Sequence, residues 1–322
     1  MAEEIMIHRS KSISLLAMVT GLVLVTGAVL SCGKGDRQET GGNGSGNEGN
    51  EKTEDTVTEI STLKVMSFNI LRGDLNGPDH LWTSRREACL AMIADEEPML
   101  FGLQECTWTQ RRHILEADSR LNAVGVAVDG QKKDYTNVSS NPIFWRTDIL
   151  SLEDWGTFWL SDTPDAIGSI TWNGVKPRTC TWARFKVRCN GKRLIYFNAH
   201  VENAAGEETK DKSIRLIVDR MREANPSLQV PMLFGGDMNS KASASCLAAM
   251  MTYLTHAPSN CQETDKGRTL NSFKATGGSA IDHLFYNKEG FTGKKFWVNR
   301  KEYKNVTYIS DHYPIFCELE FN

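Results

Sequence analysis

The chain has 322 residues and 40% hydrophobic content, enough to bury the core of one large domain or two modest ones. A disulfide-stabilised miniprotein and a fully disordered chain are therefore excluded. The formal net charge is -3, which excludes a generally basic surface for holding nucleic acid. From residue 63 onward acidic and basic residues are nearly equal in number, so binding of nucleic acid would require a local groove.

The first 32 residues have the layout of an export signal. An apolar run over residues 13–30 follows Arg9 and Lys11, and such a positive front is typical of secretory signals. The run ends in Leu-Ser-Cys-Gly, which resembles the lipobox of bacterial lipoproteins. We predict that residues 1–32 are a lipoprotein signal peptide with Cys32 as the lipidated residue. A plain transmembrane anchor is the alternative, because 18 apolar-leaning residues are borderline for spanning a bilayer.

The next segment, residues 33–62, is rich in Gly, Asn, Glu and Thr and contains almost no apolar residue. Such a segment cannot bury enough surface to order itself, so it predicts a flexible tether. A lipid on Cys32 and this tether would hold the following domain, residues 63–322, at a membrane of the cell envelope.

The cysteines give few constraints. Besides Cys32 there are seven, an odd number, without CxxC or other zinc-like spacing. We therefore expect no metal site built from thiolates. Export permits disulfides, and Cys246 with Cys261 is a possible local pair, while the apolar surroundings of several others predict buried thiols.

The domain begins with alternating apolar residues over 63–70, which predict a half-buried strand with a polar end. An amphipathic helix is expected over 84–97 and a strand over 99–103. Further strands are expected at 123–128, 142–146, 179–187, 193–199, 230–234, 280–286 and 312–320, and a long helix at 207–223. Many strands with few intervening helices predict a single domain, a four-layer α/β sandwich of two mixed β-sheets with flanking helices.

Polar and titratable residues follow or flank these apolar runs. They are Asn69, Glu105, Asn198, His200, Asp237, Asn239, Asp282, Asp311 and His312. Each alone has a structural explanation, since Asn or Asp at a strand end usually makes an Asx turn and a single His is commonly a hydrogen-bonded structural residue. Their recurrence at so many strand ends predicts one shared site at one edge of the sheets.

Taken in order, the segments SFNI, LQE, NAH, GGDMNS, IDHLFY and SDHYP resemble the endonuclease/exonuclease/phosphatase superfamily, over about residues 63 to 322. Residues 158–164 with Arg178 and 181–185 are similar to a bacterial branch of it. The resemblance implies a DNase I-like fold and a divalent-metal-dependent phosphoric-ester hydrolase. Two departures exist: Met99 stands where the family usually has Asp, and residues 198–203 read NAHVEN where it commonly reads NTHLDH.

The resemblance also implies a role for each polar residue. Glu105 with Asn69 would hold Mg²⁺ or Mn²⁺, because hard cations prefer oxygen ligands. Asp282 would orient the imidazole of His312, which lies next to Asp311. The remaining assignments are Asp237 and Asn239 to the attacking water, His200 to the phosphate or leaving group, and Arg178 and Asn198 to the substrate. Whether His312 or Asp237 is the general base stays open.

Two functions of different classes compete. The first is an exported, lipid-anchored, metal-dependent phosphoric-ester hydrolase that acts as a nuclease, phosphodiesterase or phosphatase. The second is a non-catalytic envelope lipoprotein that keeps the fold for binding. Every expected polar position is filled by a chemically competent residue, which favours the enzyme. The fold does not decide among nucleic acid, sugar-phosphate and lipid head-group substrates. We expect a monomer.

Overall fold

The computed structural model describes residues 60–73, 77, 80–130 and 138–322. The predicted signal peptide, Cys32 and nearly all of the predicted tether lie outside the described residues. All described helices and strands belong to one compact unit, Asp55–Asn322. Within the described part of the chain, no helix has the length and apolar character needed to cross a membrane.

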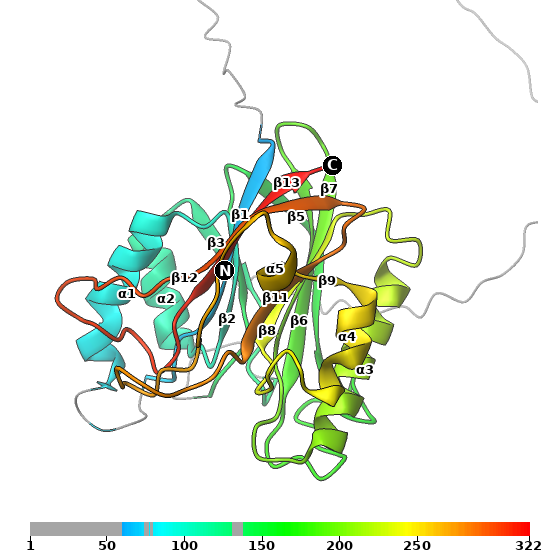
Figure 1. Ribbon diagram of the computed structural model, residues 1–322, viewed down its shortest axis with the longest axis horizontal. Helices are drawn as coiled ribbons and strands as arrows, with labels where there is room; N and C mark the ends of the chain where they lie inside the picture. Colours follow the sequence, from blue (N-terminus) through cyan, green and yellow to red (C-terminus); the bar gives the residue numbers. More distant parts are fainter. Residues whose placement is uncertain (1–59, 74–76, 78–79, 131–137) are drawn as a thin grey trace, which may run out of the picture. The chain divides into compact units, whose positions relative to one another are not determined.

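Two mixed β-sheets form the interior of this unit (Figure 1). The seven-stranded sheet has the order β10 (Glu263–Asp265), β12 (Phe291–Val298), β13 (Ile315–Phe321), β1 (Thr62–Asn69), β2 (Leu100–Gln104), β4 (Ile143–Arg146), β3 (Leu121–Val124). The six-stranded sheet has the order β5 (Leu150–Trp159), β6 (Thr179–Val187), β7 (Arg193–His200), β8 (Met232–Asp237), β11 (Asp282–Tyr286), β9 (Thr255–His256).

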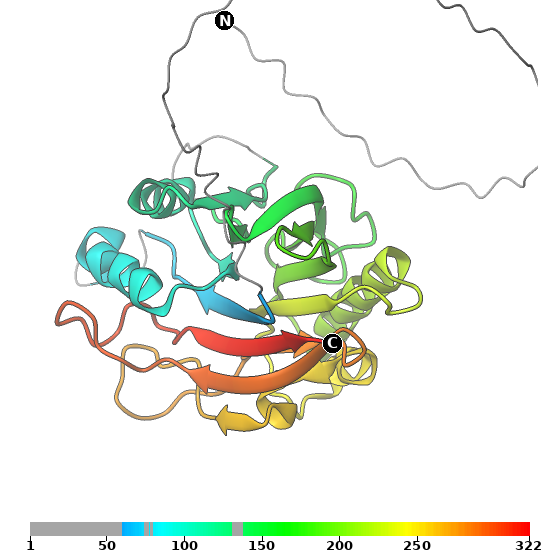
Figure 2. The same ribbon diagram turned by 90° about the horizontal axis from the view of Figure 1, so that it is seen from above.

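Helices cover the outer face of each sheet (Figures 1 and 2). The helices are α1 (Trp82–Glu96), α2 (Trp108–Ala117), α3 (Glu207–Ala224), α4 (Ala248–Tyr253) and α5 (Ala257–Asn260), with a 3₁₀ turn at Ser245–Leu247. Strand β1 shows how the layers arise: Val65 packs in the cluster between the sheets, and Met66 in the cluster beneath α1 and α2. A third cluster, including Ile217, joins α3 to the other sheet. The predicted α/β sandwich is confirmed.

Strand pairing brings the polar strand ends to one edge. Strands β1 and β2 are parallel, with Asn69 opposite Gln104. Strands β7 and β8 are also parallel, with His200 opposite Asp237, and β11 runs antiparallel to β8 with Asp282 opposite Asp237. The last residues of four strands and the first residue of a fifth therefore lie together, as strand-end patterning predicts.

The nine expected strands all exist, with ends shifted by one to a few residues. The shift that matters for the polar strand ends is in β8, which continues past residue 234 and includes Asp237 as its last residue. Strand β5 was not predicted because its middle is polar and exposed, with Glu153 and Asp154 on an edge strand. Helix α2 was not predicted either, although Thr107 and Gln110 form a capping box at its start.

The possible local pair of Cys246 with Cys261 is not formed, since both cysteines are free. The Sγ of Cys246 contacts Ser240 Oγ at 3.4 Å, whereas the Sγ of Cys261 lies 3.5 Å from that of Cys317. The seven cysteines of the described residues are free, and all but Cys189 are buried. Buried thiols were the expectation for the apolar positions, and the structure confirms it.

Candidate functional site

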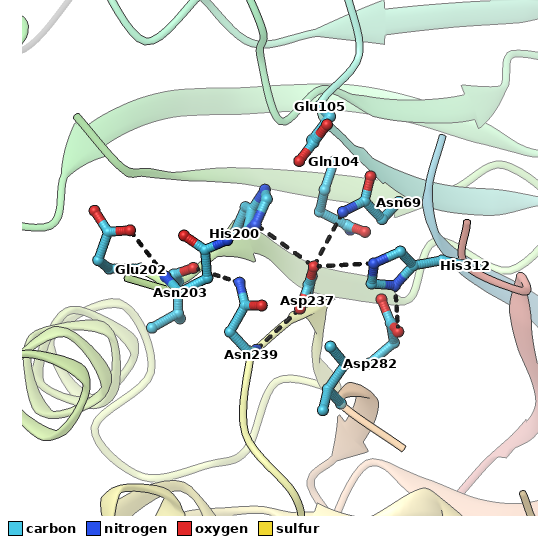
Figure 3. Close-up of polar contacts among 12 residues, drawn as sticks. Asn69, Gln104, Glu105, His200, Glu202, Asn203, Asp237, Asn239, Asp282 and His312 are labelled. Carbon is cyan, nitrogen blue, oxygen red and sulfur yellow. Dashed lines mark hydrogen bonds and ion pairs between the residues drawn. The ribbon is translucent and has the colours of Figure 1, made fainter. Parts of the chain in front are cut away.

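Asp237 is the centre of the polar cluster shown in Figure 3. It ends β8 and is 1% exposed. One carboxylate oxygen, Oδ2, accepts a hydrogen bond from Asn69 Nδ2 at 3.0 Å and lies 3.5 Å from His200 Nε2 and 3.8 Å from His312 Nε2. Side chains from both sheets thus converge on one oxygen atom.

His312 is held by a second carboxylate. Its Nδ1 lies 2.8 Å from Asp282 Oδ2, an oxygen that also accepts from the hydroxyl of Thr269. Because a carboxylate only accepts, the Nδ1 of His312 carries a proton. Burial opposes the imidazolium, but the charges of Asp282 and Asp237 outweigh it and raise the pKa of His312 to about 10. The ring is therefore a cation at neutral pH.

The pKa of Asp237 is raised as well, but for a carboxyl group this favours the neutral form. Burial raises its pKa, and repulsion from Asp282 raises it further, while His312 and the Asn69 amide partly oppose both. The resulting pKa is about 7. A carboxyl group with this pKa can exchange a proton near neutral pH, which is the property required of a general base.

His200 lies as close to Asp237 as His312 does but has a different charge. Burial, and then the positive charges of Arg178, His312 and Lys176, hold the pKa of His200 well below its usual range. Its imidazole is therefore neutral at neutral pH and can donate an N–H bond without carrying charge.

Asn239 extends the cluster on the loop after β8. Its backbone N–H donates to Asp237 Oδ1 at 2.9 Å, and its Nδ2 donates to the carbonyl of Val201 at 2.9 Å. The residue has a φ of 47°, a left-handed conformation that Asn tolerates better than most residues. The Nζ of Lys210 donates to the Asn239 carbonyl at 2.9 Å. These contacts fix the amide beside Asp237.

Asn69 and Glu105 supply the oxygen atoms expected for a cation site. Asn69 ends β1, and its Oδ1 accepts from the backbone N–H of Leu71 at 3.1 Å. Glu105 follows β2 with a φ of 58°, and its Oε2 accepts from Arg72 N–H at 3.4 Å. Its carboxylate is directed toward the Asp237 cluster in Figure 3. An oxygen-only donor pair that leaves positions for water and phosphate fits Mg²⁺.

The structure also shows a second group of possible ligands. Among the described residues, Asp237, Asp282 and His312 have ligand atoms within 4.8 Å of one another and could hold a metal ion. Two of these residues already bond each other, since His312 Nδ1 donates to Asp282. This group is accordingly suited to holding protons as well as to binding a cation.

A buried arginine that the sequence did not single out joins two loops of the seven-stranded sheet, the one after β1 and the one between β12 and β13. Arg85 is 1% exposed; its Nη1 donates to the carbonyls of Ile70 at 2.8 Å and Ile309 at 2.7 Å. These carbonyls lie next to Asn69 and Ser310. Burial lowers the pKa of Arg85, opposed by Cys89 and by two site carboxylates, Asp311 and Glu105. Sequence reasoning missed Arg85 because a charged residue at the polar start of a predicted helix has the pattern of a solvated residue.

Asp311 lies on the same loop and is half-buried. Its backbone carbonyl accepts from the N–H groups of Asn271 at 2.7 Å and Ser272 at 2.9 Å. Next to it, Ser310 Oγ donates to the carbonyl of Asn69 at 2.7 Å. The segment 310–312 is thus tied to the end of β1.

The substrate contact expected of Asn198 is not supported. Its side chain is 0% exposed; Nδ2 donates to the carbonyls of Leu103 and Pro142, each at 2.9 Å, and Oδ1 accepts from Gln104 Nε2 at 2.7 Å. Asn198 therefore joins the two sheets. Arg178, in contrast, lies within electrostatic reach of His200 and donates from Nη2 to Asn203 Oδ1 at 3.1 Å.

The sequence profile of the Endonuclease/Exonuclease/phosphatase family matches residues 66–312, more than half of the chain. The chain belongs to this family. The family's enzymes are metal-dependent hydrolases of phosphoric esters. The matched range includes every residue of the Asp237 cluster, from Asn69 to His312. The resemblance of the six sequence segments to this family is thereby confirmed.

Solved structures of family members are similar along nearly their whole length. A family protein from Bacteroides thetaiotaomicron has a TM-score of 0.72 and 29% identity, covering 81% of this chain and 98% of its own. One from Bacteroides vulgatus has a TM-score of 0.75 and 25% identity, covering 82% and 100%. A mannosyl-6-phosphatase of B. thetaiotaomicron has a TM-score of 0.72 and 29% identity, covering 80% and 100%. The chain matches none of the curated proteins with which its sequence was compared.

Proposed function

We propose that this family member is a divalent-metal-dependent phosphoric-ester hydrolase. The observation that carries the proposal is the convergence of Asn69, His200 and His312 on one oxygen of buried Asp237. Hydrolysis of a phosphate ester needs a proton acceptor for water, positive charge for the phosphoryl oxygens, and help for the leaving oxygen. The cluster contains a group with the protonation state for each task. A binding protein that had lost catalysis would have no need of all three.

The protonation states favour Asp237 as the base. His312, with a pKa of about 10, already carries its protons at neutral pH and cannot accept another, whereas Asp237 has a pKa of about 7. We assign proton removal from the attacking water to Asp237, with Asn239 orienting that water. The His312 cation then offers its Nε2–H to a phosphoryl oxygen, and neutral His200 offers an uncharged N–H.

Glu105 and Asn69 would hold the cation, Mg²⁺ or Mn²⁺. When bound, such an ion supplies positive charge to the phosphoryl and leaving oxygens. The chain's part is to direct two oxygen ligands to one place: the Glu105 carboxylate toward the cluster and the Asn69 Oδ1 beside it. The bond from Asn69 Nδ2 to Asp237 fixes which end of that amide faces the cation.

A sugar phosphate monoester is the substrate class we propose first. The mannosyl-6-phosphatase that is 29% identical acts on a phosphorylated sugar by its name. The nearly balanced charge of residues 63–322 also offers little to a long nucleic acid. Phosphodiester and nucleic-acid hydrolysis remain the alternative within the same chemistry.

A substrate panel tests this function. The purified protein with Mg²⁺ is assayed on mannose 6-phosphate, p-nitrophenyl phosphate, bis-p-nitrophenyl phosphate and plasmid DNA in one buffer. We expect the monoesters to be hydrolysed fastest and the DNA slowest. Fastest cleavage of the diester or DNA would move the enzyme to the phosphodiesterase alternative. No hydrolysis of any substrate with Mg²⁺ or Mn²⁺ would instead support a non-catalytic binding lipoprotein.

We further propose that the enzyme is exported and anchored in the cell envelope through a lipid on Cys32. The apolar run, its basic front and the lipobox-like end support this. Metabolic labelling with a palmitate analogue should mark the parent protein in the membrane fraction. The Cys32→Ser variant should lose the label, and an unlabelled parent would contradict lipidation.

A further inference from the structure

The loops beside His200 are joined by a buried carboxylate, Glu202. The residue lies just after β7 and is 2% exposed. Its two oxygens accept from four backbone N–H groups and one guanidinium: Val175 (3.1 Å) and Lys176 (3.0 Å) at Oε2, and Asn203 (2.9 Å), Ala204 (3.1 Å) and Arg178 Nη2 (3.4 Å) at Oε1. Glu202 therefore connects the β5–β6 loop to the β7–α3 loop.

This arrangement keeps Glu202 ionised despite burial. Burial raises the pKa of a carboxyl group, but the N–H of Ala204, the charge of Arg178 and the other N–H donors outweigh it and bring the pKa of Glu202 to about 2. A carboxylate bonded this completely has no capacity left to take up a proton or activate water. Its place in the fold is to position other groups.

The groups it positions are cationic and lie within electrostatic reach of His200. Arg178 and Lys176 both act electrostatically on His200 and lower its pKa. Arg178 also has a buried Nε that, among the described residues, donates to no partner. A buried guanidinium N–H without an acceptor is costly, and a phosphoryl oxygen is an acceptor that guanidinium binds well.

The same loop is held at a second place. The indole of Trp172 donates to Asp162, and the hydroxyl of Thr209 at the start of α3 donates to the Trp172 carbonyl. Trp172 and Asn173 both have positive φ values, 54° and 61°. Non-glycine residues adopt this conformation when the surrounding contacts impose it. With Trp172 held at one end of the turn, Glu202 fixes the other end, where Lys176 and Arg178 lie.

We infer that Glu202 is the positioning residue for substrate phosphate: it holds Arg178 and the backbone of Val175–Lys176 beside His200 so that Arg178 binds a phosphoryl oxygen. This inference rests on the proposed function, because it assumes that phosphate binds at the Asp237 cluster. It assigns Glu202 to binding and not to the chemical step. Its loss should therefore appear in KM and in the affinity for free phosphate.

The test compares the purified parent with the Glu202→Gln variant, using p-nitrophenyl phosphate as substrate and inorganic phosphate as a competitive inhibitor. Glutamine keeps the shape of the side chain but removes the charge that holds Arg178. We expect KM and the phosphate inhibition constant to rise about tenfold or more, and kcat to change less than about threefold. The matched control is Glu208→Gln, an exposed residue paired with Lys212, which should match the parent.

A change in kcat with an unchanged phosphate inhibition constant would overturn the inference, as would constants within twofold of the parent. If Glu202→Gln fails to fold by thermal melting, Arg178→Gln decides. We expect it to raise the same two constants, and unchanged constants would overturn the inference. In the variant that carries both Glu202→Gln and Arg178→Gln, KM and the phosphate inhibition constant should rise no further than in Arg178→Gln alone, since Glu202 acts through Arg178.

Failure of the proposed function would be recognised separately. A parent protein that hydrolyses no ester but binds inorganic phosphate in a calorimetric titration would reject the enzyme and leave Glu202 to be judged by that binding. Glu202→Gln should then weaken phosphate binding about tenfold. Equal affinity in parent and variant would overturn the inference on its own.

Discussion

The two histidines beside Asp237 show how neighbours set the charge of identical side chains. His200 Nε2 and His312 Nε2 lie 3.5 Å and 3.8 Å from the same oxygen, and both rings are buried. The pKa of His312 is nevertheless raised to about 10, while that of His200 is held well below its usual range. Distance to Asp237 cannot explain this difference.

The second neighbour of each ring explains it. The Nδ1–H of His312 donates to Asp282, whose charge compensates the cost of burial, whereas the charges that act on His200 are the positive ones of Arg178, His312 and Lys176. One side of Asp237 thus holds a fixed cation and the other a neutral donor. A phosphate between them meets charge on one side and an uncharged N–H on the other.

The largest expected effect comes from removing the carboxylate that both histidines share. Asp237→Asn should lower kcat/KM about a thousandfold or more because the proton acceptor is lost. Thermal stability above pH 7 should not fall. The pKa of Asp237 is raised to about 7. Its ionisation therefore lowers the stability of the parent as pH rises from the pKa of the unfolded chain through 7. A neutral amide avoids that cost. Loss of activity in proportion to lost stability would contradict the catalytic role.

Replacing each histidine by glutamine tests the difference between them directly. Glutamine can replace a neutral N–H donor but not a cation. We expect His312→Gln to lower kcat about a hundredfold and His200→Gln about tenfold or less. Single-turnover rates at pH 7.5 provide the measurement. Equal losses in the two variants would mean that the charges assigned to the rings are wrong.

Asp282→Asn sharpens the same comparison through pH. Removing the carboxylate removes the partner of the imidazolium, so the pKa of His312 should fall from about 10. If the protonated ring is the active form, activity is lost on the alkaline side as His312 deprotonates, and this limb of the kcat/KM profile should move at least about one unit lower. A limb at the same pH in parent and variant would show that His312 does not set it.

The smallest effect on catalysis is expected at Asn198, which bonds both sheets away from Asp237. Asn198→Ala leaves two carbonyls and the Gln104 amide without partners. It should lower the free energy of unfolding by about 2 kcal/mol, measured by urea denaturation. Activity per folded molecule should stay within about threefold of the parent. A large rise in KM would restore the substrate contact first expected for this residue.

The fold was predictable where local pattern and tertiary role agree. The buried strands β2 and β8 have continuous apolar runs, β1 has an alternating one, and all three end at or beside polar residues of the site. Strand β5 lies at a sheet edge with an exposed polar middle, so its sequence lacks that signal. The contact between the free thiols of Cys261 and Cys317 joins the end of α5 to β13, two segments far apart in the chain, and spacing alone could not reveal it.

The site was predictable as a set of residues, though not in its connections. The strand ends and their order indicated Asn69, His200, Asp237 and His312. The bonding partners decided the rest. Asn69 and Asn198 are both buried, but the amide of Asn69 donates to Asp237, whereas that of Asn198 donates to backbone carbonyls of the other sheet. Arg85 and Glu202 have the sequence pattern of surface charges, yet their bonds to distant backbone groups place them inside.

Metal dependence is the central claim and has the most direct test. The purified protein is freed of metal with EDTA and assayed on p-nitrophenyl phosphate before and after addition of excess Mg²⁺, beside the Glu105→Gln variant. We predict that EDTA abolishes hydrolysis, that Mg²⁺ restores it, and that the variant needs at least about tenfold more Mg²⁺ for half-maximal rate. A rate that EDTA leaves unchanged would contradict the account.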